Sequence, residues 1–222
     1  MNGSNSADDF STLRGRMVAE QLRARGISDP RLLAAFSRVP RHVFVPAEQR
    51  DDAYGDYPLP IGEGQTISQP YIVAAMLAHV ALQPSDIVLE IGTGSGFQTA
   101  VLAELVEHVC SIERYDALAE RARAALTGLG YANATVFTGD GSAGLAELAP
   151  FDAVIVSAAA PRVTTEWLEQ LREGGRIIAP IGAPQAQELQ LVQQVNGQPV
   201  MTHLEGCRFV PLVGTEGFSR AR

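Results

Sequence analysis

The segment Gly92-Thr93-Gly94-Ser95-Gly96 constrains the fold of this chain more than any other. It follows a short apolar run at 86–91 and precedes a helical run that reaches Val106. Glycines at such a strand-to-helix turn let the main chain bend tightly and let a ligand approach it closely. The G-x-G-x-G spacing differs from the G-x-G-x-x-G of dinucleotide sites, and alone it also suits a tight turn without a ligand.

Apolar strands and helical runs alternate after this turn. Because the strands are almost continuously apolar, we expect them to be buried on both faces of a parallel sheet. The alternation predicts an α/β fold with a doubly wound, mostly parallel sheet and helices on both faces. The predicted strands are 86–91, 109–112, 135–137, 153–156 and 176–180, and the predicted helices are 70–81, 97–106, 117–129 and 167–171.

The two ends of the chain differ from this core. Helices are predicted at 11–25 and 30–39, and the proline- and glycine-rich stretch 40–64 is predicted to be a covering loop. Asn196-Gly197 lies between alternating runs and predicts a hairpin, hence an antiparallel edge, after which 209–214 returns beside the core. We expect a disordered tail at 1–10 and one domain at 11–222. This domain would consist of the N-terminal helices with the covering loop (11–66), a cofactor-binding core (67–183), and a C-terminal hairpin with a tail (184–222).

Composition restricts the class of partner and the compartment. With 17 Lys and Arg against 25 Asp and Glu, the formal net charge is −8, which disfavours nucleic acid. Cys110 and Cys207 are too isolated for a disulfide framework or a metal site. The polar, acidic start at 1–9 does not resemble a signal peptide, and no apolar run approaches the roughly 18 residues of a membrane span. We expect a soluble, cytoplasmic protein.

Two acidic residues follow the next two predicted strands. Glu113 lies about twenty residues after Gly92, where a carboxylate accepts both hydroxyls of an adenosine ribose. Asp140, followed by Gly141, could receive the adenine amine. Helix capping and an ordinary Asp-Gly turn are the structural alternatives for these two residues. Because the carboxyl ends of these strands share one crevice, the set indicates S-adenosylmethionine (SAM) or a dinucleotide.

The segment 62–70, Gly-Glu-Gly-Gln-Thr-Ile-Ser-Gln-Pro, precedes the first core helix. Ser68 would cap that helix, with Pro70 in its first turn, and capping is compatible with a functional role. The glycines at 62 and 64 favour the close approach of a bulky group.

These motifs closely resemble the signature of protein-L-isoaspartate O-methyltransferases, and the resemblance covers nearly the whole chain. It implies a SAM-dependent methyltransferase fold, and methylation by SAM of the free α-carboxylate of L-isoaspartyl residues in damaged proteins and peptides. S-adenosyl-L-homocysteine is the second product, and the ester collapses to a succinimide that hydrolyses partly to Asp. We expect a monomer. The matching segments are 60–62, 65–70, 89–96, 139–141, 152–156, 174–175 and 209–212.

The resemblance also assigns the site. Ser68 matches the family's active-site serine, and Thr66 and Ile67 belong to the segment that closes over the cofactor. No metal is implied. The remaining cofactor-binding residues on this assignment are Glu90, Gly92, Thr93, Gly94, Ser95, Gly96, Glu113, Arg114, Asp140 and Gly141.

The expected chemistry needs no general base, because a carboxyl with pKa near 4 is already ionised at pH 7. We expect Ser68 to donate a hydrogen bond that aims the carboxylate, and the 40–64 segment, including Tyr54 or Tyr57, to form the peptide groove. The rival readings are an NAD-dependent oxidoreductase, another SAM-dependent carboxyl, small-molecule or RNA methyltransferase, and a SAM-binding sensor without catalysis.

Overall fold

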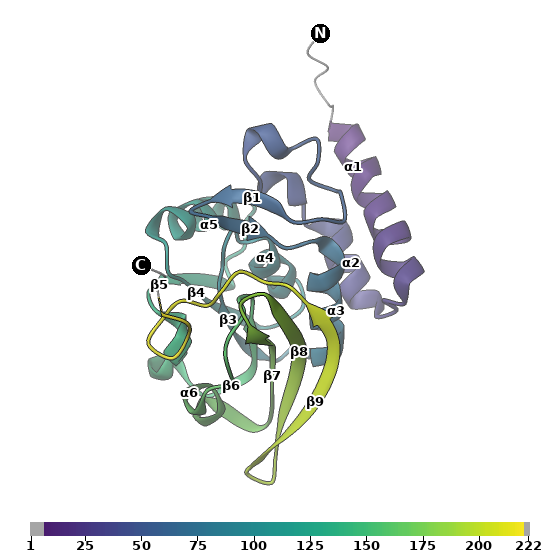
Figure 1. The fold of residues 1–222 in the computed structure, drawn as a ribbon. Helices are drawn as coiled ribbons and strands as arrows, with labels where there is room; N and C mark the ends of the chain where they lie inside the picture. Colours follow the sequence, from purple (N-terminus) through teal and green to yellow (C-terminus); the bar gives the residue numbers. More distant parts are fainter. Residues whose placement is uncertain (1–6, 220–222) are drawn as a thin grey trace.

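The computed structural model describes residues 7–219 and builds them around a seven-stranded sheet of order β5-β4-β3-β6-β7-β8-β9 (Figure 1). Pairing is parallel from β5 to β7 and antiparallel through β8 and β9. This confirms the predicted α/β fold with an antiparallel C-terminal edge. The strands are β3 (Ile87–Ile91), β4 (His108–Glu113), β5 (Ala134–Thr138), β6 (Phe151–Val156), β7 (Leu171–Ala183), β8 (Ala186–Val195) and β9 (Gln198–Cys207).

The strand order reverses beside β3. The chain moves outward from β3 to β4 and β5, and then returns so that β6 pairs with the other side of β3. The connections on the two sides of β3 therefore lead away from each other and leave a crevice at the carboxyl ends of β3 and β6. Open α/β sheets bind their ligands at such a point.

Helices cover the two faces of the sheet unequally. Val88 joins the core cluster under α3 (Pro70–Val80), α4 (Phe97–Ala103) and α5 (Asp116–Gly128), whereas its neighbour Leu89 joins the cluster on the opposite face. That second cluster contains the fully buried Trp167 of the short helix α6 (Thr165–Glu169) and Leu212 of the C-terminal segment. Burial on both faces explains the continuous apolar character of the strands.

The N-terminal helix begins earlier than the sequence predicted. Helix α1 (Ala7–Arg16) continues as a π-helical segment (Met17–Leu22) and a 3₁₀ turn (Arg23–Arg25). Residues 7–10, which we assigned to a disordered tail, are therefore helical, and 1–6 lie outside the described residues. The ring of Phe10 stacks on His42 with centroids 4.1 Å apart, which anchors this first turn.

The 40–64 stretch contains more regular structure than the predicted loop. After helix α2 (Pro30–Arg38), which the Asp29 side chain caps, the chain forms 3₁₀ turns at Arg41–Val43 and Ala47–Gln49. Strand β1 (Leu59–Gly62) then pairs with β2 (Gln65–Ile67) in a hairpin, so the boundary that we placed between 66 and 67 falls inside β2. Positive φ angles at Glu63 and Gly64 make its turn, and Gly64 has open space around it rather than a bulky neighbour.

The C-terminal part follows the prediction except at its start. Leu171 pairs with Phe151 ahead of a bulge, so β7 begins where we expected a helix to end. Asn196 and Gly197 have the positive φ values of the predicted hairpin turn between β8 and β9. The chain then returns to the core as expected, where the Leu212 N–H donates to the Ala159 carbonyl.

Candidate active site

The glycine-rich loop connects β3 to α4 in a conformation that side chains disfavour. Gly92, Gly94 and Gly96 have φ values of +93°, +56° and +89°. A Cβ at Gly96 would also approach Ala122 of α5 to 3.1 Å. Gly92 and Gly94 line the crevice, whereas Gly96 lets α5 pack closely and lines none of the cavities found in the described residues.

Glu113 ends β4 beside this loop and is 5% exposed. Its Oε2 accepts the N–H of Gly94 at 2.8 Å, and its Oε1 accepts the N–H of Tyr115 at 3.0 Å. The carboxylate therefore fixes the loop and caps α5, which is the structural alternative that the sequence left open. Each oxygen keeps acceptor capacity, so a ribose can share the same group.

Asp140 holds the C-terminal segment against the core. Its two oxygens accept the N–H groups of Ser142 at 2.9 Å and Thr215 at 2.8 Å. Burial alone would raise the pKa of Asp140, but the hydrogen bonds from Ser142 and Thr215 lower it below its ordinary value. Arg114 reinforces this attachment through the Val213 carbonyl at 2.7 Å.

Gly141 lies where β3 and β4 approach the crevice. A Cβ at this position would lie 2.8 Å from the Cγ2 atoms of both Ile91 and Ile112. Since these methyl groups belong to branched side chains of buried strands, they cannot move aside easily. The glycine is required by packing at the floor of the crevice.

Glu90 does not lie where a cofactor-binding residue would. Its side chain is completely buried behind the loop, accepts hydrogen bonds from Gln98, Thr99 and Ser111, and lines no cavity among the described residues. Burial, with a smaller contribution from the nearby Glu113, raises the pKa of Glu90 to about 7 despite these hydrogen bonds. Gln98, which bonds to Glu90, lines the space between the loop and β2, so Glu90 reaches that space through Gln98.

Ser68 follows β2 and precedes α3. The helix is capped by Gln69 without a side-chain hydrogen bond, so the expectation that Ser68 caps it is wrong. No hydrogen bond joins the Ser68 hydroxyl to any other described residue, and its side chain lines two adjoining cavities. The hydroxyl is therefore available to a ligand.

Two cavities meet beside this serine, at Thr66 and Ser157. A groove of about 1130 Å³ is open to solvent, and a covered crevice of about 70 Å³ lies over Gly92 and Glu113. In Figure 1 the C-terminal segment crosses between β2 and the sheet, and thereby covers this crevice. The two cavities share wall residues from β2, the end of β6 and the C-terminal segment: Thr66, Ser157, Val210 and Pro211.

The predicted site residues gather around these cavities with few exceptions. Besides Glu90 and Gly96, Asp140 lines none of the four cavities described here, and the C-terminal segment covers it. The crevice is lined by Thr66, Gly92, Gly94, Glu113, Arg114 and Gly141, and a third space of about 40 Å³ between the loop and β2 is lined by Ile67, Ser68, Thr93 and Ser95.

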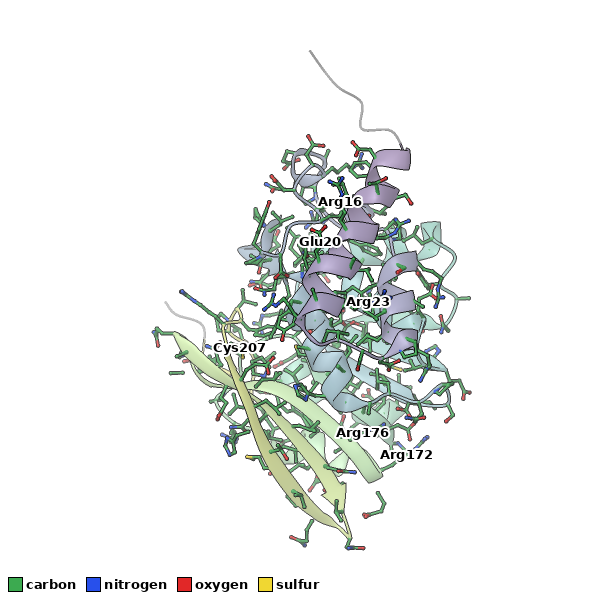
Figure 2. All side chains as sticks on the ribbon, turned by 90° about the vertical axis from the view of Figure 1, so that its right-hand side faces the viewer. Arg16, Glu20, Arg23, Arg172, Arg176 and Cys207 are labelled. Atoms are coloured by element: carbon green, nitrogen blue, oxygen red, sulfur yellow. The ribbon has the colours of Figure 1, made fainter. Side chains whose placement is uncertain are left out.

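The large groove is built from other parts of the chain than expected. Tyr54 is buried and bonds to His42, and the exposed Tyr57 bonds to Asp52, so neither lines the groove. Within 40–64 only Pro58 does. The rest of the groove comes from the start of α3 and from segments 184–187 and 205–211. Figure 2 shows Cys207 at the end of β9, on this side of the molecule.

Ser157 is the functional candidate that the sequence analysis missed. It is the first residue after β6, lies against Gly92, and lines the groove, the crevice and the space below Ser68. The sequence signal that could have identified Ser157 is its position directly after the apolar run 153–156. Recognising it required the knowledge that β6 returns beside β3, which periodicity along one chain does not supply.

A family model described as protein-L-isoaspartate(D-aspartate) O-methyltransferase matches residues 14–217. The chain belongs to this family. It is 50% identical over 222 residues to the protein-L-isoaspartate O-methyltransferase of Koribacter versatilis, with 100% of both chains covered. It is also 50% identical over 215 residues to the enzyme of that name from Syntrophus aciditrophicus, with 96% of this chain and 99% of the relative covered. The predicted family is thereby confirmed.

Solved structures agree with this family assignment. A protein-L-isoaspartate O-methyltransferase superposes with a TM-score of 0.84 at 30% identity, covering 92% of this chain and 67% of the other. A Plasmodium falciparum protein of the same description, solved with S-adenosyl-L-homocysteine, superposes with a TM-score of 0.79 at 24% identity. That alignment covers 92% of this chain and 98% of the other, and it supports the fold.

Residues 7–219 offer neither a metal-binding cluster nor a membrane-spanning helix. No group of three or more His, Cys, Asp or Glu side chains there is placed to hold a metal ion. Across the same residues, no helix has the length and apolar character to span a bilayer.

Proposed function

We propose that this chain transfers the methyl group of SAM to the free α-carboxylate of L-isoaspartyl residues in proteins and peptides. Family membership supports the reaction, and the observation that supports its location is the wall shared by the groove and the crevice. A peptide carboxylate in the groove and a nucleoside in the crevice would meet at Thr66, Ser68 and Ser157. The resulting ester would cyclise to a succinimide and hydrolyse partly to Asp, which is a repair reaction.

The crevice suits the cofactor. Glycines let the ligand approach the main chain closely, and Glu113 has acceptor capacity left for ribose hydroxyls. SAM supplies a sulfonium methyl group, which is electrophilic because of the positive charge on sulfur. The crevice is narrow, so entry of the nucleoside requires an outward shift of Thr66 or of residues 210–213. Arg114 and Asp140, which bond to the C-terminal segment, would then hold that segment over the bound nucleoside.

The substrate end needs positioning rather than proton transfer. The carboxylate is ionised at neutral pH, and transfer of a methyl group from sulfonium to carboxylate neutralises both charges. A covered site favours this reaction because the separated charges are better hydrated than the transition state. We assign Ser68 as a donor that aims the carboxylate, and alignment of oxygen, carbon and sulfur can contribute roughly 7–11 kcal/mol in favourable cases.

The groove indicates how a protein substrate would be recognised. Its lining includes three charged residues, Arg25, Glu205 and Arg208, beside apolar residues of α3 and of 209–211. Such a surface suits an extended, flexible segment of a damaged protein. We also propose that the chain is a monomer that acts on proteins in the cytoplasm. We further propose that it does not bind nucleic acid, consistent with the net charge of −8.

The proposal is tested by methylation of matched peptides that contain Asp or isoaspartate at one position, with labelled SAM. We expect label in the isoaspartyl peptide alone, and release of labelled methanol as the ester collapses. Equal labelling of both peptides would indicate a general carboxyl methyltransferase. Binding of SAM without labelling would indicate a sensor, and binding of NADH in place of SAM, measured by parallel calorimetry, an oxidoreductase.

A further inference from the structure

A chain of three side chains runs from the buried core to the wall between the two cavities. Nε2 of Gln98 lies 3.0 Å from Oε1 of Glu90 and 2.7 Å from Oγ of Ser157. Glu90 and Gln98 are buried, whereas Ser157 reaches the groove and the crevice. The chain therefore connects a residue that cannot touch a ligand with one that can.

The ionised form of Glu90 fixes the direction of these hydrogen bonds. Its Oε2 receives the hydroxyls of Thr99 and Ser111, and its Oε1 receives the Gln98 amide. A carboxylate oxygen requires a donor, so the nitrogen of the Gln98 amide, and not its oxygen, must face Glu90. The second hydrogen on that nitrogen then points to Oγ of Ser157, which accepts it.

Ser157 is thereby left with a free donor. No other described residue forms a hydrogen bond with its hydroxyl, so the hydrogen on Oγ is available to the cavities that Ser157 lines. Ser68, also without a side-chain partner, lines the same 40 Å³ space. Two residues with free hydroxyl donors therefore line one small space beside the glycine-rich loop.

We propose that Ser157 donates a second hydrogen bond to the isoaspartyl carboxylate, opposite Ser68, and that Gln98 and Glu90 are positioning residues that turn its hydroxyl hydrogen toward the substrate. This inference rests on the proposed function. A carboxylate has about four acceptor positions on two oxygens, so two donors can hold it while another lone pair attacks the methyl group. One donor leaves rotation about the carboxyl bond free, whereas two fix it.

The pair Ser157→Ala and Ser157→Thr tests the donor. We expect Ser157→Ala to lower kcat/KM for the isoaspartyl peptide by about 10- to 100-fold, the range for a hydrogen bond to a charged group, and to leave the SAM Kd unchanged. Ser157→Thr keeps a hydroxyl and should recover most of the activity. Ser85→Ala, an exposed serine outside every cavity, is the matched control. Unchanged kcat/KM in Ser157→Ala, or an equal loss in SAM affinity, would overturn the proposal.

Gln98→Leu tests the positioning role. If Gln98 acts through Ser157, Gln98→Leu should lower kcat/KM less than Ser157→Ala, and the double variant should lose no more than Ser157→Ala alone. A purely structural role would give losses that multiply and would follow the change in melting temperature, which is measured alongside. Should Gln98→Leu fail to fold, the comparison of Ser157→Ala with Ser157→Thr still decides the donor role.

The wild-type chain separates this inference from the proposed function. If it methylates the isoaspartyl peptide and Ser157→Ala does so equally well, the function stands and the inference fails. If the wild type labels neither peptide while it binds SAM, the proposed function itself fails.

Discussion

The covered crevice and the open groove meet at one wall but are built in opposite ways. The crevice comes largely from the turns that follow β3 and β4, and its contacts are buried hydrogen bonds to main-chain groups. The groove is assembled from α3, β8, β9 and the C-terminal segment, and its side chains are mostly exposed. Consecutive turns on a rigid sheet suit one invariant cofactor, whereas an exposed surface built from distant segments suits peptides of varied sequence.

This contrast predicts that substitutions on one side of the wall leave the other side's ligand unaffected. Glu113→Ala should have the largest effect, because it removes the acceptor of the Gly94 and Tyr115 N–H groups together with the proposed ribose contact. Hydrogen bonds to charged groups contribute about 1.5–3 kcal/mol each, so the SAM Kd should rise by about 100-fold or more. Calorimetry with SAM measures the change.

The matched control for this substitution is Glu107→Ala, an exposed residue whose side chain makes no hydrogen bond within the described residues. It should bind SAM like the wild type. A large rise in peptide KM at saturating SAM in Glu113→Ala would contradict the separation of the two sides.

Glu90 lies beneath the wall, and its effect should appear as a pH dependence of stability. Burial raises its pKa from 4.5 to about 7, so the folded chain holds this proton more tightly than the unfolded chain between those values. The free energy of unfolding should therefore fall as pH rises from about 4.5 to about 7, by up to about 3 kcal/mol from this group. The lowered pKa of Asp140 acts at lower pH and with the opposite sign.

Glu90→Gln isolates this contribution. Urea unfolding of both proteins at pH 5 and pH 8 should show that the wild type loses stability relative to Glu90→Gln at the higher pH. Parallel pH profiles of the two proteins would show that Glu90 is not the titrating group.

At the wall itself, Ser68→Ala should separate turnover from binding. Without a donor to aim the carboxylate, kcat should fall by about 10-fold or more, while the SAM Kd stays within about twofold. Steady-state kinetics with the isoaspartyl peptide and calorimetry with SAM measure the two quantities, with Ser85→Ala as control. Equal losses in both quantities would place Ser68 on the cofactor side instead.

The same contrast explains how much the sequence could predict. Gly92, Gly94 and Glu113 were found because strand, turn and helix follow one another along the chain, and local spacing carries that information. Local spacing could not identify Ser157 and Pro211, which line the groove together with Ser68. Ser157 arrives there through the pairing of β6 with β3, and Pro211 through the return of the C-terminal segment. The burial of Glu90 and the cover over Asp140 could not be predicted for the same reason, since burial by distant segments leaves no local signal.

The groove side should show the smallest effect. Arg208 lines the groove and forms no ion pair with any described residue, so it is free to attract acidic side chains that flank the damaged position. Exposed ion pairs contribute about 0.2–1 kcal/mol, so Arg208→Ala should raise KM about two- to fivefold for a peptide with flanking Asp or Glu and should hardly change it for one with flanking Lys. The difference should shrink at high salt.

Arg16→Ala is the matched control for this substitution, because Arg16 is exposed on the N-terminal helix, lines none of the four cavities, and lies apart from Cys207 in Figure 2. It should leave KM unchanged for both peptides, and neither variant should alter the SAM Kd. A rise in KM that is the same for acidic and basic peptides would show that Arg208 shapes the groove without selecting charge. A change in SAM affinity would show that a substitution in the groove alters cofactor binding in the crevice.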